Sequence, residues 1–215
     1  LFASWAKVEG IEVEVLHVNY GLRGEESDGD AIFVAEQAKL RDLPCRILKV
    51  EPKTQPSTGI QAWARQIRYE WFAKLCDATD KVLLAHHLDD HVETILMRIV
   101  RGSGLSGLQG MKVVHGVYWR PFLDVSQRYL QEIAQREKIL HREDSSNAKL
   151  DYSRNRIRKL VLPELEEMFP GAGQNLIELA QAGQEWARFY GNIFAELKEP
   201  TTPEVWRNLG FYPAS

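Results

Sequence analysis

The sequence contains very little cysteine and no long apolar run, and each absence excludes a class of protein. Cys45 and Cys76 are the only cysteines among 215 residues, too few for a disulfide framework. Their separation matches neither a C-x-x-C redox pair nor a four-thiolate cluster, which favours two reduced structural thiols. No stretch approaches the roughly 18 to 20 apolar residues that span a bilayer, and no signal sequence opens the chain. We therefore expect a cytoplasmic protein.

The chain also lacks a strong net charge and the best-known nucleotide-binding motifs. A formal net charge of -3 provides no global attraction to nucleic acid, so such binding would need local basic patches. No Walker A sequence occurs, and no G-x-G-x-x-G follows a predicted strand. What is present, 44% hydrophobic and 27% charged residues, is typical of a folded water-soluble protein.

Apolar patterns alternate between strand and helix along the first half of the chain. Residues 1–10 resemble the end of a helix, and short β-branched runs at 11–18, 46–50 and 81–85 predict three strands. Helical patterns occupy 25–41, 59–76 and 89–100. Strands that alternate with helices predict an α/β fold, an open and mostly parallel sheet with helices on both faces.

The second half reads as a loop, a hairpin and helices. Residues 102–110 are rich in glycine and serine and predict a loop, 112–123 predict an extended pair, and 126–138 and 152–168 predict helices. Pro170 and Gly171 mark a break before an amphipathic stretch at 175–197. We therefore expect a main catalytic domain over 1–170 and the start of a small helical domain over 171–215.

Four ionisable side chains, His86, His87, Asp89 and Asp90, lie where the third predicted strand meets the next helix. Ligands of parallel sheets bind at this edge. One aspartate could simply cap the helix beside solvated histidines, or the group could hold a transition metal, which would need further ligands. We favour an active site that orients an amine, a base or nucleotide-bound Mg²⁺, because carboxylates attract an ammonium group and can accept its proton.

Basic and glycine-rich segments are further candidates. Arg65 and Arg68 could clamp phosphates or form surface ion pairs. The glycine-rich residues 101–111 could bring backbone amides close to a phosphate or a base, or could be a plain connector. Asn19, at the end of the first strand, could hydrogen-bond a base edge. Four cations within 154–159 could neutralise a nucleic-acid backbone or form a solvated helix face.

Six motifs, in this order, resemble the tRNA(Ile)-lysidine synthetases, members of the PP-loop, or N-type, ATP pyrophosphatases. They are H-V-N-Y-G-L-R-G, A-R-Q-I-R-Y, A-H-H-L-D-D-H-V-E-T, R-G-S-G-L-S-G-L-Q-G-M, R-P-F-L, and E-D-S-S-N followed by Y-S-R-N-R-I-R. The resemblance covers roughly residues 1–170 and implies a Rossmann-like PP-loop fold.

The implied reaction uses ATP and Mg²⁺ to modify isoleucine tRNA with a CAU anticodon. ATP adenylates the oxygen on carbon 2 of the wobble cytidine, and the side-chain amine of free lysine then displaces AMP. The resemblance is also compatible with a homodimer.

The resemblance assigns roles residue by residue. His86, Asp89 and Asp90 would be catalytic, with Arg65 or Arg68 at the phosphates. The remaining implied substrate-binding residues are His87, Glu93, Asn19, Arg101, Ser103, Gly104 and Gly107. The implied tRNA-binding residues are Arg154, Asn155 and Arg158. No metal site formed by the protein alone is expected.

The sequence departs from the family pattern in several places. The family's S-G-G-x-D-S loop, which wraps the ATP phosphates, has no counterpart, and the sequence begins within what would be the following helix. Either the sequence is a truncated form of an active enzyme, which we favour, or the protein is a fragment that does not catalyse. His91 replaces the usual glutamine and Tyr20 a common histidine, and the chain stops before the family's C-terminal tRNA-binding domain would be complete.

Two other functions stay open. A 2-thiocytidine synthetase of the same fold would need paired cysteines for an iron–sulfur cluster, which the sequence lacks. A non-catalytic tRNA-binding module would bind tRNA without using ATP.

Overall fold

The computed structural model describes residues 5, 6, 8–51, 55, 56, 59–142, 144 and 153–196. They divide between two compact units, unit 1 over Leu1–Val82 and unit 2 over Leu83–Ser215. Three predicted features lie wholly or partly outside the described residues: the start of the first helix, the acidic turn at 143–147 apart from Asp144, and the end of the last amphipathic stretch.

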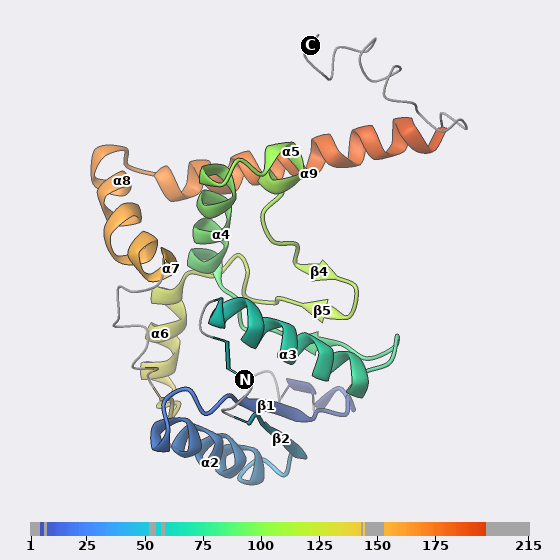
Figure 1. Ribbon diagram of the computed structural model, residues 1–215, viewed down its shortest axis with the longest axis vertical. Coiled ribbons are helices and arrows are strands. Elements are labelled where there is room, and N and C mark those ends of the chain that lie inside the picture. Colours follow the sequence, from blue (N-terminus) through green and yellow to red (C-terminus); the bar gives the residue numbers. More distant parts are fainter. Residues whose placement is uncertain are drawn as a thin grey trace. The chain divides into compact units, whose positions relative to one another are not determined.

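Unit 1 is built on two parallel strands joined by a helical crossover. β1 (Val15–Asn19) pairs with β2 (Cys45–Lys49) in a register that runs from Val15↔Cys45 to Asn19↔Lys49. Parallel strands need a long connection, and α2 (Glu25–Lys39) supplies it beside the strands in Figure 1. Its first turn carries three carboxylates and its last turn a lysine, which complements the helix dipole.

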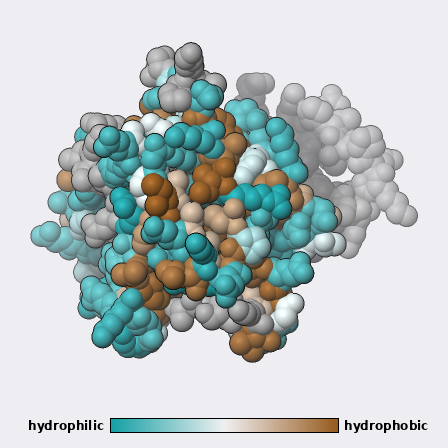
Figure 2. Space-filling model, turned by 90° about the horizontal axis from the view of Figure 1, so that it is seen from below, coloured by the Kyte–Doolittle hydropathy of each residue, from teal (hydrophilic) through white to brown (hydrophobic). Residues whose placement is uncertain are grey.

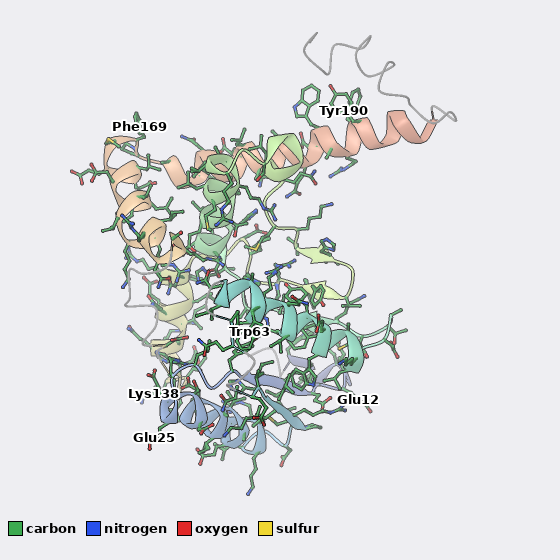
Figure 3. The ribbon with its side chains drawn as sticks, viewed as in Figure 1. Glu12, Glu25, Trp63, Lys138, Phe169 and Tyr190 are labelled. Atoms are coloured by element: carbon green, nitrogen blue, oxygen red, sulfur yellow. The ribbon has the colours of Figure 1, made fainter. Side chains whose placement is uncertain are left out.

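The helix α3 (Ile60–Leu75) is tied to the end of β1. The hydroxyl of Tyr20 donates a hydrogen bond of 2.8 Å to the carbonyl of Ala64. The Tyr20 ring also lies beside that of Trp63, with centroids 6.0 Å apart. Figure 3 labels Trp63 on α3. The residue after β1 therefore positions the first half of α3.

Several large apolar side chains of unit 1 stay exposed, including Ile11, Ile32, Leu40 and Ile47. The face drawn in Figure 2 shows hydrophobic patches among hydrophilic residues. Scattered exposed apolar residues are ordinary on protein surfaces and assign no function by themselves.

Unit 2 contains a small sheet in the order β3-β5-β4. β3 (Val82–Leu83) contains the last residue of unit 1 and the first of unit 2 in sequence, and β4 (Val114–His115) and β5 (Tyr118–Trp119) form an antiparallel hairpin. The amide of Leu84 donates to the carbonyl of Trp119 at 2.8 Å. A parallel bridge then joins His87 to Phe122. The chain that leads from β3 into the next helix is therefore held against the segment after β5.

The core of unit 2 lies between two long helices. α4 (Leu88–Val100) packs on α9 (Ala172–Glu196), as Figure 1 shows. The buried residues of this core are Val92, Ile95, Ile177 and Ala180. The short α5 (Gly104–Leu108) also contacts α9, because Gly183 has no side chain; a Cβ there would lie 3.3 Å from that of Leu108.

The remaining helices of unit 2 follow the hairpin. α6 (Gln127–Arg136) precedes a run made of α7 (Ser153–Arg156), a π-helical turn (Ile157–Val161) and α8 (Leu162–Met168). Pro163 has no amide to donate to the carbonyl four residues earlier, which accounts for irregular hydrogen bonding in the preceding turn. None of the described helices is long and apolar enough to cross a membrane.

The predicted α/β fold with parallel strands is confirmed, and the strand and helix bounds shift by a few residues. The prediction of a loop throughout 102–110 is wrong for α5. A single turn of helix forms there despite its glycines because α9 and α4 pack against it. The domain boundary near Pro170 stays a prediction.

Candidate active site

The N-terminus of α4 is closed by a reciprocal pair of hydrogen bonds between His87 and Asp90. The His87 amide donates to Oδ2 of Asp90 at 3.1 Å, and Nδ1 of His87 accepts from the Asp90 amide at 3.4 Å. This is a capping box in which an imidazole takes the place of the usual hydroxyl. The ring also lies between two carboxylates, with Nδ1 3.4 Å from Oδ2 of Asp89 and Nε2 3.4 Å from Oδ2 of Asp90.

Asp89 caps a neighbouring helix instead of its own. Its Oδ2 accepts a hydrogen bond of 2.7 Å from the amide of Gln127, the first residue of α6. The Asp89 side chain is still 45% exposed. Asp89 therefore links the N-terminus of α4 to the N-terminus of α6, and its carboxylate stays accessible to solvent.

Two carboxylates of α4 and two guanidinium groups form a cluster, here called the Glu93 cluster: Asp90, Glu93, Arg154 and Arg158. Nε of Arg154 donates to Oε2 of Glu93 at 2.6 Å, and Nε of Arg158 donates to Oε1 of the same carboxylate. Nη2 of Arg158 also donates to Oδ1 of Asp90 at 2.9 Å, and that of Arg154 lies 3.2 Å from the same oxygen. Residues more than 60 positions apart therefore meet at α4.

Burial makes the pairing in this cluster essential. Glu93 is fully buried, whereas the side chains of Arg154 and Arg158 are 32% and 26% exposed. Burial lowers the pKa of Arg158, but its hydrogen bond with Glu93 and the charges of Glu93 and Asp90 outweigh this and raise the pKa overall. A buried carboxylate is tolerated only when paired in this way.

The glycine-rich loop after α4 is held from both sides. Nη1 of Arg98 donates to the carbonyl of Gly110 at 2.6 Å, and the side-chain amide of Gln184 on α9 donates to the carbonyl of Gln109 at 2.7 Å. A Cβ on Gly107 would lie 2.0 Å from that of Ser103, so this turn requires glycine. Arg101, Ser103 and Gly104 are exposed on the same loop.

The predicted site residues of unit 1 lie at the end of β1 and on α3. Asn19 is buried; its side-chain nitrogen donates to Asp28 at 2.7 Å and its oxygen accepts from the Gly21 amide at 2.9 Å. On α3, the guanidinium of Arg65 lies 4.4 Å and that of Arg68 5.8 Å from the ring centroid of Tyr69. The side-chain amide of Asn19 therefore stabilises the turn that follows β1. On α3, the ring of Tyr69 lies close to the guanidinium groups of both arginines.

Arg68 is one of the two arginines that the sequence predicts at the ATP phosphates, and that role stays a prediction. Its Nε is buried, and no acceptor among the described residues bonds to it. Burial raises the pKa of the nearby Tyr20 hydroxyl, and the positive charge of Arg68 acts in the opposite direction. A guanidinium group in general suits an anionic ligand such as a nucleotide phosphate. Among the described residues, no group of three or more His, Cys, Asp or Glu side chains could hold a metal ion.

The structure brings together part of the predicted site. The residues of unit 2 that gather at or beside the start of α4 are His87, Asp89, Asp90, Glu93, Arg154 and Arg158. His86 directly precedes them and is half-buried, and Asn155 is buried beside Arg154. Arg154 and Arg158, predicted to contact tRNA, pair internally with the two carboxylates, and their tRNA contact stays a prediction.

Sequence reasoning missed two buried polar residues of unit 2. His91 is 5% exposed and Arg120 is 6% exposed. Burial lowers the pKa of His91, and the charges of Arg98 and Arg120 act in the same direction against Asp124. The signal available was spacing, because His91 lies four residues before the apolar Ile95 and so shares its helix face.

Comparisons with known proteins agree with this fold and these motifs. Residues 1–165 match the sequence pattern of the PP-loop domain. The tRNA(Ile)-lysidine synthase of Chlorobaculum tepidum is 34% identical over 174 residues, 79% of this chain and 53% of that protein. Those of Bacteroides thetaiotaomicron and Bacillus subtilis are 35% identical, over 91% and 82% of this chain but 47% and 39% of their own lengths. The chain thus spans about half, or less, of these relatives.

A solved structure shows the same fold at low sequence identity. The U34-tRNA thiolase NcsA from Methanococcus maripaludis, described with its [4Fe-4S] cluster, matches with a TM-score of 0.63 and 13% identity. The match covers 85% of this chain and 66% of that one, and at this identity it supports the fold alone. With the pattern match over residues 1–165, these observations show that the chain belongs to the PP-loop domain family.

Proposed function

We propose that this chain is the catalytic part of a tRNA(Ile)-lysidine synthetase, which joins lysine to carbon 2 of the wobble cytidine of isoleucine tRNA with a CAU anticodon. The observation that carries the proposal is the Glu93 cluster beside the exposed Asp89 at the start of α4. The relatives at about 35% identity, each named as this enzyme, support it.

The charges at this site complement a free amino acid. Lysine carries a carboxylate and two ammonium groups, so a matching pocket needs cations for the first and carboxylates for the others. Asp89 and Asp90 supply negative charge, and the partly exposed guanidiniums of Arg154 and Arg158 supply positive charge. The cluster holds these groups rigidly because each guanidinium contacts both carboxylates.

The second step of the reaction needs a proton acceptor. The lysine side-chain ammonium must lose a proton before its nitrogen attacks carbon 2, the carbon–oxygen bond breaks and AMP leaves. His86 and the carboxylates of Asp89 and Asp90 are the candidate acceptors, because imidazole and carboxylate groups perform general base catalysis. Asp90 is the preferred one to orient the amine, since His87 and the cluster fix both of its oxygens.

The first step needs positive charge around the triphosphate of ATP. The guanidinium groups of Arg65 and Arg68, both beside the Tyr69 ring of α3, would neutralise the phosphates together with Mg²⁺ that arrives with the nucleotide. In that step the cytidine oxygen attacks the α-phosphate and pyrophosphate leaves. The exposed loop residues Arg101, Ser103 and Gly104, with Gly107, would lie beside the reacting base.

The test is lysine incorporation by the purified native protein. With ATP, Mg²⁺ and CAU-anticodon tRNA, the protein should release pyrophosphate and AMP and attach labelled lysine to the tRNA. Asp90→Asn retains an oxygen for the capping box but removes the charge, so incorporation should fall by about a hundredfold or more. Glu132→Gln, on the exposed ion pair of α6, is the matched control and should leave the rate unchanged.

Other outcomes would select the alternatives. Binding of tRNA without release of pyrophosphate would favour a non-catalytic tRNA-binding protein. Transfer of sulfur to tRNA would favour a thiolase, although Cys45 and Cys76 are the only cysteines that the chain offers for a cluster. Normal lysine incorporation by Asp90→Asn would show that the Glu93 cluster takes no part in the reaction.

A further inference from the structure

One face of α4 carries a contact that the proposed reaction does not use. His91, Ile95 and Arg98 are spaced four and three residues apart, so they point to the same side of the helix. Gly110, the last residue of the glycine-rich loop, lies against all three. Its carbonyl accepts from Arg98 at 2.6 Å, and a Cβ built on it would lie 2.2 Å from Nε2 of His91 and 3.2 Å from Cγ1 of Ile95.

Two independent reasons require glycine at this point. Gly110 has a φ of +60°, which favours glycine, and its missing side chain leaves room for the edge of the imidazole. By contrast, Gly116 in the turn of the hairpin has a similar φ of +58° but meets nothing within 4 Å. The close approach to His91 therefore distinguishes Gly110 from a glycine needed for its turn alone.

The imidazole of His91 acts on the loop through its van der Waals contact with Gly110 and not through hydrogen bonds. It is 5% exposed, and neither ring nitrogen has a hydrogen-bond partner among the described residues. Burial, chiefly, lowers the pKa of His91; the charge of Asp124 raises it, and the charges of Arg98 and Arg120 lower it further. A flat, neutral ring in this position sets how closely the loop can approach α4, because the backbone of Gly110 rests on its edge.

We propose that His91 is a positioning residue: with Gly110 and Arg98 it seats the glycine-rich loop on α4 and so sets where Ser103, Gly104 and Gly107 meet the target base. The inference rests on the proposed function for the identity of that base, but the seating of the loop is independent of it. A displaced loop would meet the target base less well, and binding of the tRNA in the productive position would weaken.

The experiment compares matched variants by hydrogen exchange and kinetics. Gly110→Ala and His91→Ala should make the amides of 101–110 exchange about tenfold faster, whereas Gly116→Ala and His115→Ala, each matched in chemistry and away from the contact, should not. In lysine incorporation, the first two should raise the KM for tRNA about tenfold and leave the KM for ATP unchanged. His91→Gln, a planar neutral side chain, should restore both readouts.

The outcomes separate this inference from the proposed function. Unchanged exchange in both Gly110→Ala and His91→Ala would overturn the seating of the loop, even in a fully active enzyme. Faster exchange with an unchanged KM for tRNA would overturn the positioning role. If the native protein forms no lysidine, exchange and the tRNA dissociation constant decide the inference alone. If Gly110→Ala does not fold, the result for His91→Ala tests the inference by itself, because the smaller side chain creates a space at the contact and no steric clash.

Discussion

Replacing Glu93 by glutamine tests the Glu93 cluster most directly. The substitution preserves the shape of the side chain and removes its charge. In the native protein both carboxylate oxygens accept from guanidinium groups: Oε2 from Arg154 at 2.6 Å and from Arg158 at 3.1 Å, and Oε1 from Arg158. A glutamine amide can keep one acceptor but turns two further N–H donors toward cations. Asp90 would then be the only carboxylate that Arg154 and Arg158 share within the cluster.

The expected loss of stability follows from burial. Removing one partner of a buried ion pair costs about 3 to 5 kcal/mol. Because the two guanidiniums are 32% and 26% exposed, water compensates part of the loss, and we expect the lower end of the range, about 3 kcal/mol. For a chain of this size that corresponds to a drop in Tm of about 6 to 12 °C.

Thermal unfolding followed by circular dichroism measures this loss, with hydrogen exchange of the α4 amides to assign it to unit 2. Glu132→Gln is the control, because Glu132 pairs with Arg128 on the surface of α6, where their side chains are 55% and 89% exposed. That change should cost less than about 1 kcal/mol. Equal effects of the two substitutions would refute the reasoning, since burial would then contribute nothing to the pairing.

Three further predictions concern unit 2. Burial, chiefly, keeps the pKa of His91 in the folded protein below its usual value of about 6.5. As the pH drops through and below 6.5, the unfolded chain therefore binds a proton first and the free energy of unfolding decreases. His91→Gln should flatten this decrease, measured by urea midpoints between about pH 7.5 and pH 5. Gly183→Val should push α9 from Leu108 and lower the free energy of unfolding by about 1 to 3 kcal/mol, measured by urea denaturation; an unchanged midpoint would contradict the close packing. Asp89→Ala should expose the first amide of α6 and speed its exchange without affecting that of α9, and equal protection in both would argue against the cap.

The element types were predictable because short-range patterns determine them. Short β-branched runs located β1 and β2, and helical periodicity located α2, α3 and α4 within a few residues. The glycine-rich residues 102–110 were misread in part. Glycine disfavours helix in isolation, and only packing against α4 and α9 makes α5 form.

The candidate site was predictable where the motif is contiguous. His87, Asp89 and Asp90 follow one another, and the strand-to-helix junction indicated their common place. The partners of Asp90 could not be read in the same way. Arg154 and Arg158 lie more than 60 residues away and looked like an exposed basic face, since a charge pattern does not reveal which carboxylate it will meet.

The sequence by itself determined the order of strands and helices, the family resemblance and the residues that can supply charge, because each depends on neighbours along the chain. Only the tertiary structure decided how these residues are used. It buried Glu93 and so required two guanidiniums around it, and it brought Gly110 against the ring of His91. Burial and close approach are properties of packed helices, and no local pattern of residues specifies them.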